Sequence, residues 1–179
     1  VLGDYIGVGL FYKNFDKQIE RRIAPEAQNL EVSFVNVPNA TVYGAEVEIR
    51  KRLNFISNEN HQTKLGLNTT FIYARTQVDT DEYEARKEID PNAKSTRPMY
   101  GQSPYIVNVY ASYMNTVKNI VVNVSYNVWG ERLSFVSRGR VPDVYEQPRP
   151  TLDLTLQKGI GEKVVINLKS AKLILCLLV

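Results

Sequence analysis

The sequence predicts an all-β fold in which antiparallel up-and-down strands, about seven of them, form an arc of a transmembrane β-barrel. Three observations lead to this prediction. Apolar and polar residues alternate with period two along successive segments. Most segments run roughly 9–11 residues, the length that a tilted strand needs to cross a bilayer. The connections between them alternate between short and long.

The first two predicted strands show the alternation. In residues 5–12 one face carries Ile6, Val8, Leu10 and Tyr12, opposite Gly7 and Gly9. In residues 41–50 one face carries Thr41, Tyr43, Ala45, Val47 and Ile49, opposite Val42, Gly44, Glu46, Glu48 and Arg50. Because successive side chains of a strand point to opposite sides, each segment is predicted to have one apolar face and one face of polar or small residues.

The next three predicted strands follow the same pattern. In residues 65–74, Leu65, Leu67, Thr69, Phe71 and Tyr73 oppose Gly66, Asn68, Thr70 and Ala74. In residues 105–113, Tyr105, Val107, Val109, Ala111 and Tyr113 oppose Asn108, Tyr110 and Ser112. In residues 122–128, Val122, Val124, Tyr126 and Val128 oppose Asn123, Ser125 and Asn127.

The last two predicted strands complete the arc. In residues 151–157, Leu152, Leu154 and Leu156 alternate with Thr151, Asp153, Thr155 and Gln157. The seventh strand begins with Val164, Ile166 and Leu168, opposite Asn167 and Lys169.

Connection length separates this pattern from a soluble antiparallel sheet. Short connections are predicted at Asn54–Gln62, Asn115–Asn119 and Gly159–Lys163, and long ones at Asn14–Ser33, Thr76–Pro104 and Ser137–Pro150. The long connections contain much of the charge, and a short helix is predicted at Asp81–Ile89. Short turns at one rim and long loops at the other are typical of outer-membrane barrels.

Aromatic residues lie near the ends of several apolar faces. They are Tyr12, Tyr43, Tyr73, Tyr105, Tyr113 and Tyr126. Such rings are typical of the girdles at a membrane interface, although tyrosine is also common in ordinary strands.

Composition excludes several classes of protein. The 179 residues are 44% hydrophobic and 23% charged, which argues against disorder. The net charge of +3 comes from scattered residues, so nucleic-acid binding is not expected. Cys176 is the only cysteine, so no disulfide can form within the chain. No apolar run reaches the length of a membrane-spanning helix.

The candidate chemical groups predict no catalytic, cofactor or metal site. His61, the only histidine, is expected to be a solvated turn residue. The acidic cluster Asp79, Asp81, Glu82 and Glu84 lacks the glycine and final glutamate of a helix–loop–helix calcium site. It is expected to be a solvated loop, with Arg86 and Lys87 offsetting its charge.

Residues on the polar faces are assigned to a lumen. Glu46, Glu48 and Arg50 lie on one strand face, where a polar pore lining explains them more simply than paired catalytic carboxylates. Gly7, Gly9 and Gly44 are expected to leave room for a plug or a bulge. In the loops, Arg138, Arg140, Tyr145 and Arg149 are candidates to contact a ligand, which the sequence does not identify.

Two other classes of function require different properties from those of a membrane arc. A soluble β-sandwich binding module predicts that the apolar faces pack against each other. An enzyme needs a catalytic constellation that these residues do not supply.

Several stretches resemble one known family. They are Leu10-Phe11-Tyr12-Lys13; Asn36 and Ala40 with Tyr43 to Lys51; Arg97 to Tyr105 with Asn108; Tyr126-Asn127 with Gly130 and Arg132; and Pro142-Asp143, Tyr145-Glu146 and Pro148-Arg149 with Asp153 and Lys158. In this order and spacing they resemble the C-terminal β-barrel of TonB-dependent outer-membrane receptors of the type common in Bacteroidetes. The resemblance runs from about Asp4 to Ala171.

The resemblance implies a function and its partners. Such receptors take up a large, scarce nutrient across the outer membrane with energy delivered through TonB. A plug domain fills a barrel of about 22 strands, and extracellular loops capture the ligand. The implied partners are outer-membrane lipid, the remaining barrel and plug, and TonB through an N-terminal part. No cofactor is implied.

Two departures from the family lead to the expectation of a fragment that does not function alone. The chain shows neither a plug nor a TonB-contacting segment, and it lacks the final strand with its terminal aromatic residue. Residues 1–171 are expected to be a partial barrel. Residues 172–179 are apolar on both faces after Lys172, so a frameshift or premature stop is expected, with a short variant strand as the alternative.

Overall fold

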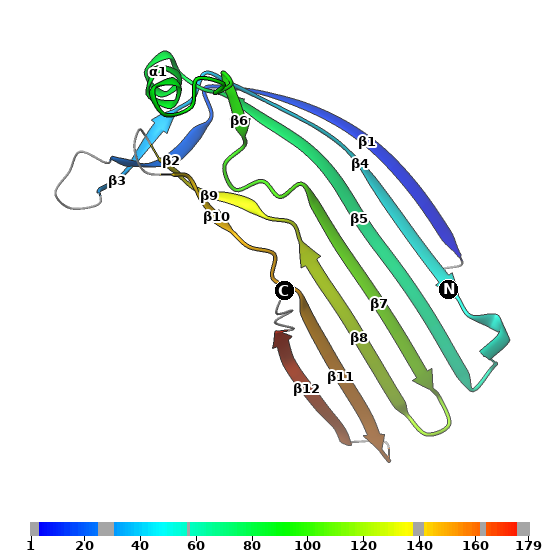
Figure 1. Cartoon of the computed structure of the whole chain (residues 1–179). Coiled ribbons are helices and arrows are strands. Elements are labelled where there is room, and N and C mark those ends of the chain that lie inside the picture. Colours follow the sequence, from blue (N-terminus) through cyan, green and yellow to red (C-terminus); the bar gives the residue numbers. More distant parts are fainter. Residues whose placement is uncertain (1–3, 25–30, 57, 138–141, 162–163, 175–179) are drawn as a thin grey trace.

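The computed structural model describes residues 4–24, 31–56, 58–137, 142–161 and 164–174, and it is dominated by one curved sheet (Figure 1). In spatial order its strands are β1 (Tyr5–Asp16), β4 (Asn39–Arg52), β5 (His61–Gln77), β7 (Tyr105–Asn115), β8 (Ile120–Trp129), β11 (Thr151–Ile160) and β12 (Val164–Ile174), with β6 (Thr96–Pro98) paired to β5. All of these pairs are antiparallel. Within the described residues β1 and β12 are open edges, so the predicted antiparallel arc is confirmed.

The three long connections meet at one end of this sheet. There, a second sheet has the order β10 (Val144–Glu146), β9 (Arg132–Ser137), β2 (Ile19–Ala24) and β3 (Glu31–Asn36). Helix α1 (Thr80–Ile89) lies beside it (Figure 1). The short turns, including the 3-10 helix η1 (Asn54–Ile56), lie at the opposite end (Figure 1). The predicted sorting of short and long connections, and the predicted helix, are thus present.

The apolar face of the sheet is open rather than packed. Ile6 is 74% exposed, Val8 71% and Leu10 84%. The strand registers join such residues into continuous rows, for example Leu10 opposite Ala45 and Ala45 opposite Phe71. A β-sandwich would bury these side chains against a second layer. The described structure therefore does not favour the β-sandwich alternative.

Aromatic residues cluster near the loop end of this face. Tyr12 lies opposite Tyr43, and Tyr43 lies opposite Tyr73 with its ring stacked 5.0 Å from that of Tyr73. Tyr105 is in the adjacent row, opposite Phe71. Tyr126 departs from the expected girdle, because it lies opposite Val109 and Leu152 within the strands.

The buried apolar side chains are gathered at the loop end. They are Val37, Ala40, Val42, Val78, Leu133 and Val136. They come from β4, from β9 and from the residues next to β3 and β5. Within the described residues, the polar face of the sheet has no apolar core of its own. The small core at the loop end instead packs the long connections against one another.

The predicted loop Asn14–Ser33 is largely strand, and this is a correction. β1 continues to Asp16, and β2 and β3 form a hairpin beyond it. Lys17 separates them with a φ of 51°, and its backbone N–H donates to Pro38 O at 3.0 Å. A positive φ interrupts the alternation of sides. Even-numbered residues therefore face outward in β1, whereas Glu20 and Arg22 of β2 are buried, with Glu20 only 2% exposed.

Glycines on the lumen face are mostly covered by aromatic rings of the same sheet. A Cβ added at Gly7 would collide with the Tyr5 ring, and one at Gly44 would collide with Phe71 O and the Phe11 ring. The expectation of free space is therefore wrong at Gly7 and Gly44. Gly9 is different, because a Cβ there would meet only Glu46 atoms at 3.9 Å.

We expect Gly44→Ala to lower the free energy of unfolding by about 1–3 kcal/mol, because the added methyl group meets a backbone oxygen that cannot move aside. Gly9→Ala, on the same face of the adjacent strand, is the matched control and should leave stability unchanged or slightly raised. Urea unfolding of the detergent-solubilised receptor measures both effects. Equal stability of the two variants would contradict the steric argument.

The final part of β12 lies where the alternation of apolar and polar residues is lost in the sequence. The pairing of β11 with β12 shifts register between Leu152 and Leu154, so that Leu154 lies opposite Ser170 and Leu152 opposite Leu173. Such a bulge inserts one extra residue into a strand. Of the predicted apolar tail, residues 172–174 belong to β12, and residues 175–179, including Cys176, lie outside the described residues.

Candidate functional site

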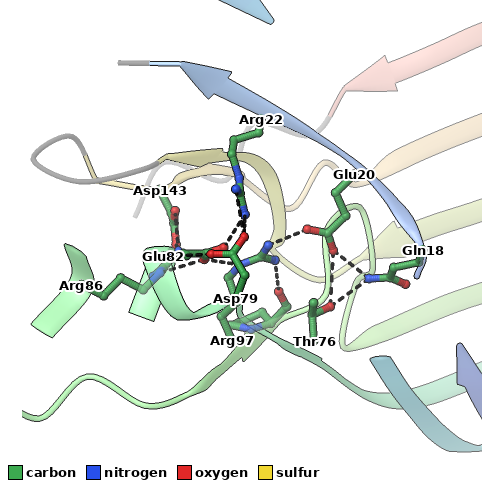
Figure 2. A network of polar contacts seen from close by, with 10 residues as sticks. Gln18, Glu20, Arg22, Thr76, Asp79, Glu82, Arg86, Arg97 and Asp143 are labelled. Atoms are coloured by element: carbon green, nitrogen blue, oxygen red, sulfur yellow. Dashed lines mark hydrogen bonds and ion pairs between the residues drawn. The ribbon is translucent and has the colours of Figure 1, made fainter. Parts of the chain in front are cut away.

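A network of buried charges connects the long connections at the loop end of the sheet (Figure 2). It is built on the start of α1, where the N-cap residue Asp79 accepts a hydrogen bond from the backbone N–H of Glu82 at 2.7 Å. A carboxylate at this position satisfies one of the unpaired N–H groups of the first helical turn. The cap fixes the first turn of α1 and so the position of Glu82.

Glu82 is the central acceptor of the network and is only 1% exposed. Its carboxylate accepts hydrogen bonds from Arg22 Nη2 at 2.7 Å, Arg97 Nε at 2.8 Å and Arg86 Nε at 2.9 Å. These arginines come from β2, β6 and α1 itself (Figure 2). Three charged donors offset the cost of burying this carboxylate.

Glu20 is the second buried acceptor. Arg97 Nη2 donates to it at 2.5 Å, Gln18 Nε2 at 2.8 Å and Thr76 Oγ1 at 3.3 Å. Arg97 therefore bridges Glu20 of β2 and Glu82 of α1 while only 3% exposed. Burial opposes the charge of Arg97, but attraction and hydrogen bonds from these carboxylates outweigh burial and raise its pKa above the ordinary arginine value.

Two further ion pairs complete the network, and one of them reaches the third long connection. Arg86 Nη2 donates to Asp143 Oδ2 at 2.8 Å, and Arg22 Nη1 lies 3.2 Å from Asp79 Oδ2. Asp143 belongs to the connection between β8 and β11, Arg22 to that between β1 and β4, and Arg86 to that between β5 and β7. One set of charges thus joins all three.

The acidic cluster of the sequence is only partly a solvated loop. Asp81 and Glu84 are exposed, but Glu82 is buried and Asp79 caps α1, so the expectation is wrong for these two. The expected charge compensation by Arg86 is present, whereas Lys87 lies over the Tyr83 ring instead. Within the described residues, His, Cys, Asp and Glu side chains form no group that could hold a metal ion.

His61 is not the solvated residue that the sequence predicts. It begins β5 and is half-buried, and its Nδ1 lies 2.7 Å from the Tyr113 hydroxyl. Asn115 Nδ2 approaches the same ring nitrogen at 3.5 Å. These contacts fix the short-turn end of the sheet, where β5 pairs with β7.

The lumen face has polar groups in register. Glu48 accepts a hydrogen bond from Arg50 Nε at 2.7 Å, which places this pair along the wall. In one row Glu48 lies opposite Asn68, Asn68 opposite Asn108 and Asn108 opposite Asn127. Asn127 Nδ2 donates to Asn108 Oδ1 at 2.5 Å. Such a row of amides and charges suits contact with water, a plug or a polar ligand.

The predicted ligand contacts in the loops remain predictions. Arg138 and Arg140 lie outside the described residues. Arg149 is exposed after β10, and Tyr145 lines a hollow of about 260 Å³ together with Arg75 and Glu131.

None of the described helices has the length and apolar character needed to span a membrane. The family described as TonB dependent receptor-like, beta-barrel, matches residues 2–168. No curated protein and no solved structure gives a significant match. The matched region contains β1 to β11, the first part of β12 and the loop network. This chain therefore belongs to the TonB-dependent receptor β-barrel family, a family of outer-membrane transporters and receptors rather than enzymes.

Proposed function

We propose that this chain forms part of the barrel wall of a receptor that takes up a large nutrient across the outer membrane, with the loop end facing outside the cell. The observation that supports this most directly is the buried network at that end. It joins three connections into one ordered surface. An ordered surface binds a ligand without first losing loop entropy.

The two faces of the sheet support the membrane placement. The exposed rows that contain Leu10 and Phe71 suit acyl chains, and the opposite rows that contain Asn108 and Asn127 suit an aqueous lumen. A ligand captured by the loops would meet polar side chains along its path through the wall.

The two open edges of the sheet suggest that strands from elsewhere in the receptor complete the barrel. The outer edges of β1 and β12 carry no strand in the described arc. Unpaired backbone groups are very costly in lipid, so we propose that other strands of the receptor pair with both edges. The arc alone would then not transport, and a plug within the lumen would connect the receptor to TonB.

The orientation can be tested by cysteine labelling of the whole receptor in intact cells, after all native cysteines, Cys176 among them, have been replaced by serine. Asn92→Cys lies in the long connection after α1, and Val117→Cys lies in the short turn between β7 and β8. We expect a membrane-impermeant maleimide to label Asn92→Cys on intact cells, and Val117→Cys only after the outer membrane is permeabilised.

Leu154→Cys, on the exposed apolar face, is the control for lipid contact and should stay unlabelled in both conditions. Labelling of Val117→Cys on intact cells without labelling of Asn92→Cys would show that the short turns, and not the long connections, face outside the cell. Rapid labelling of Leu154→Cys would contradict the membrane placement.

A further inference from the structure

Two hollows meet at Tyr73, near the loop end of the sheet. One has a volume of about 560 Å³ and an apolar lining that includes Leu10, Ala45 and Phe71. The other, of about 260 Å³, includes Arg75 and Tyr145. Ile72, Tyr73 and Pro104 line both. We propose that the pair binds a phosphate-bearing lipid of the surrounding membrane leaflet, with an acyl chain in the first hollow and the headgroup at the second.

The apolar hollow is shaped by a small residue within a row of large ones. The register places Ala45 between Leu10 of β1 and Phe71 of β5. Leu10 and Phe71 remain exposed, and Tyr43 and Tyr73 form the next row toward the loops. The short side chain of Ala45 therefore leaves a groove on the exposed apolar face, within the hollow of about 560 Å³.

Arg75 places a positive charge at the end of this groove. It follows Tyr73 on the same face of β5, its Nε donates to the Tyr73 hydroxyl at 3.2 Å, and its guanidinium lies 5.3 Å from the centre of the Tyr73 ring. Within the described residues Arg75 forms no ion pair. Its remaining N–H groups can donate hydrogen bonds to a phosphate, which a guanidinium group binds through two parallel hydrogen bonds.

The second hollow offers neutral donors and an acceptor beside Arg75. Gln102 and Tyr145 contribute polar groups, and Glu131 is held by a hydrogen bond from Gln147 Nε2 at 2.8 Å. Burial, then the nearby Asp143 carboxylate, raises the pKa of Tyr145, so its hydroxyl stays protonated and can donate. These groups suit the glycerol or sugar hydroxyls of a headgroup. Because the carboxylate of Glu131 repels a negatively charged phosphate, the phosphate is expected to lie on the Arg75 side of this hollow.

This inference rests on the proposed membrane placement, and native mass spectrometry of the whole receptor in detergent tests it. The probes are dipalmitoyl phosphatidic acid and dipalmitoylglycerol, which share acyl chains and differ in the phosphate. We expect the wild-type receptor to retain dipalmitoyl phosphatidic acid in preference to dipalmitoylglycerol. Arg75→Gln should weaken phosphatidic acid binding about tenfold and leave dipalmitoylglycerol binding unchanged.

A second variant tests the groove separately. Ala45→Leu fills the hollow and should weaken the binding of both lipids, and since Ala45 is only half-buried on an unpacked apolar face the larger side chain should leave folding intact. The matched controls are Ala111→Leu, which lies on the same face between Leu65 and Val124, and Lys13→Gln, which lies on the opposite face of β1. Both controls should bind lipid as the wild type does.

The outcomes separate this inference from the proposed function. Equal retention of the two lipids by wild-type receptor, or wild-type binding by both Arg75→Gln and Ala45→Leu, would overturn the lipid site. If the cysteine labelling of Asn92, Val117 and Leu154 positions still follows the proposed orientation, only the lipid site fails. If that labelling fails as well, the membrane placement itself is wrong.

Discussion

Replacing Arg97 with methionine is expected to lower the free energy of unfolding by about 3–5 kcal/mol. Arg97 bridges Glu20 and Glu82, and all three side chains are at most 3% exposed. Without the guanidinium, two carboxylates remain buried with fewer positive partners. Urea unfolding of the detergent-solubilised receptor measures the loss, and limited proteolysis of the long connections should show that they open first.

Arg132→Met is the matched control for the Arg97 variant. Arg132 also pairs with a glutamate, Glu146, but both side chains are more than a third exposed. Water screens such a pair, so its removal should cost about 0–1 kcal/mol. Adding Glu20→Gln to Arg97→Met should recover part of the loss, because an amide costs less to bury than a carboxylate. Equal losses for Arg97→Met and Arg132→Met would refute the structural role of the network.

Val124→Lys is expected to destabilise the receptor in lipid by about 2–4 kcal/mol if the residue lies near the bilayer midplane. Val124 is in the middle of β8, between Ala111 of β7 and Leu154 of β11, on the apolar face. A lysine there must remove its ammonium group from water or distort the bilayer to reach it. Unfolding from lipid vesicles in guanidinium chloride measures the effect.

Ser125→Lys is the control on the adjacent residue. Ser125 faces the opposite side, where Asp153 of β11 and Tyr110 of β7 lie opposite it. An added ammonium group there stays in a polar environment, so stability should change little. If both lysine variants behave alike, the assignment of the two faces is wrong.

The strands and their faces could be predicted from the sequence because their signal is local. The alternation of Leu152, Leu154 and Leu156 with polar residues needs no knowledge of distant parts of the chain, and the register confirms it. The same holds for α1, where Asp79 and the following acidic residues mark a helix start. The narrower resemblance to receptors of Bacteroidetes stays a prediction.

The loop network could not be predicted because its signal is not local. Arg97 and Glu20 are separated by 77 positions, and Arg22 and Glu82 by 60. The local signal within the predicted loop was weak, since Ile19 lies between the polar residues Gln18 and Glu20 but Arg21 breaks the apolar–polar alternation of a strand. The positive φ of Lys17 was not foreseeable, because lysine adopts it rarely.

The shared network has a consequence for how such receptors could diversify. The connection between β5 and β7 holds the counter-charges of the other two, as Arg86 with Asp143 and Glu82 with Arg22 illustrate. Recombination that exchanged a single connection would bring in an ionised group without its counterpart, at a large cost in stability. New ligand preferences would therefore be inherited as complete sets of three connections, or would arise at exposed loop tips that the charges do not touch.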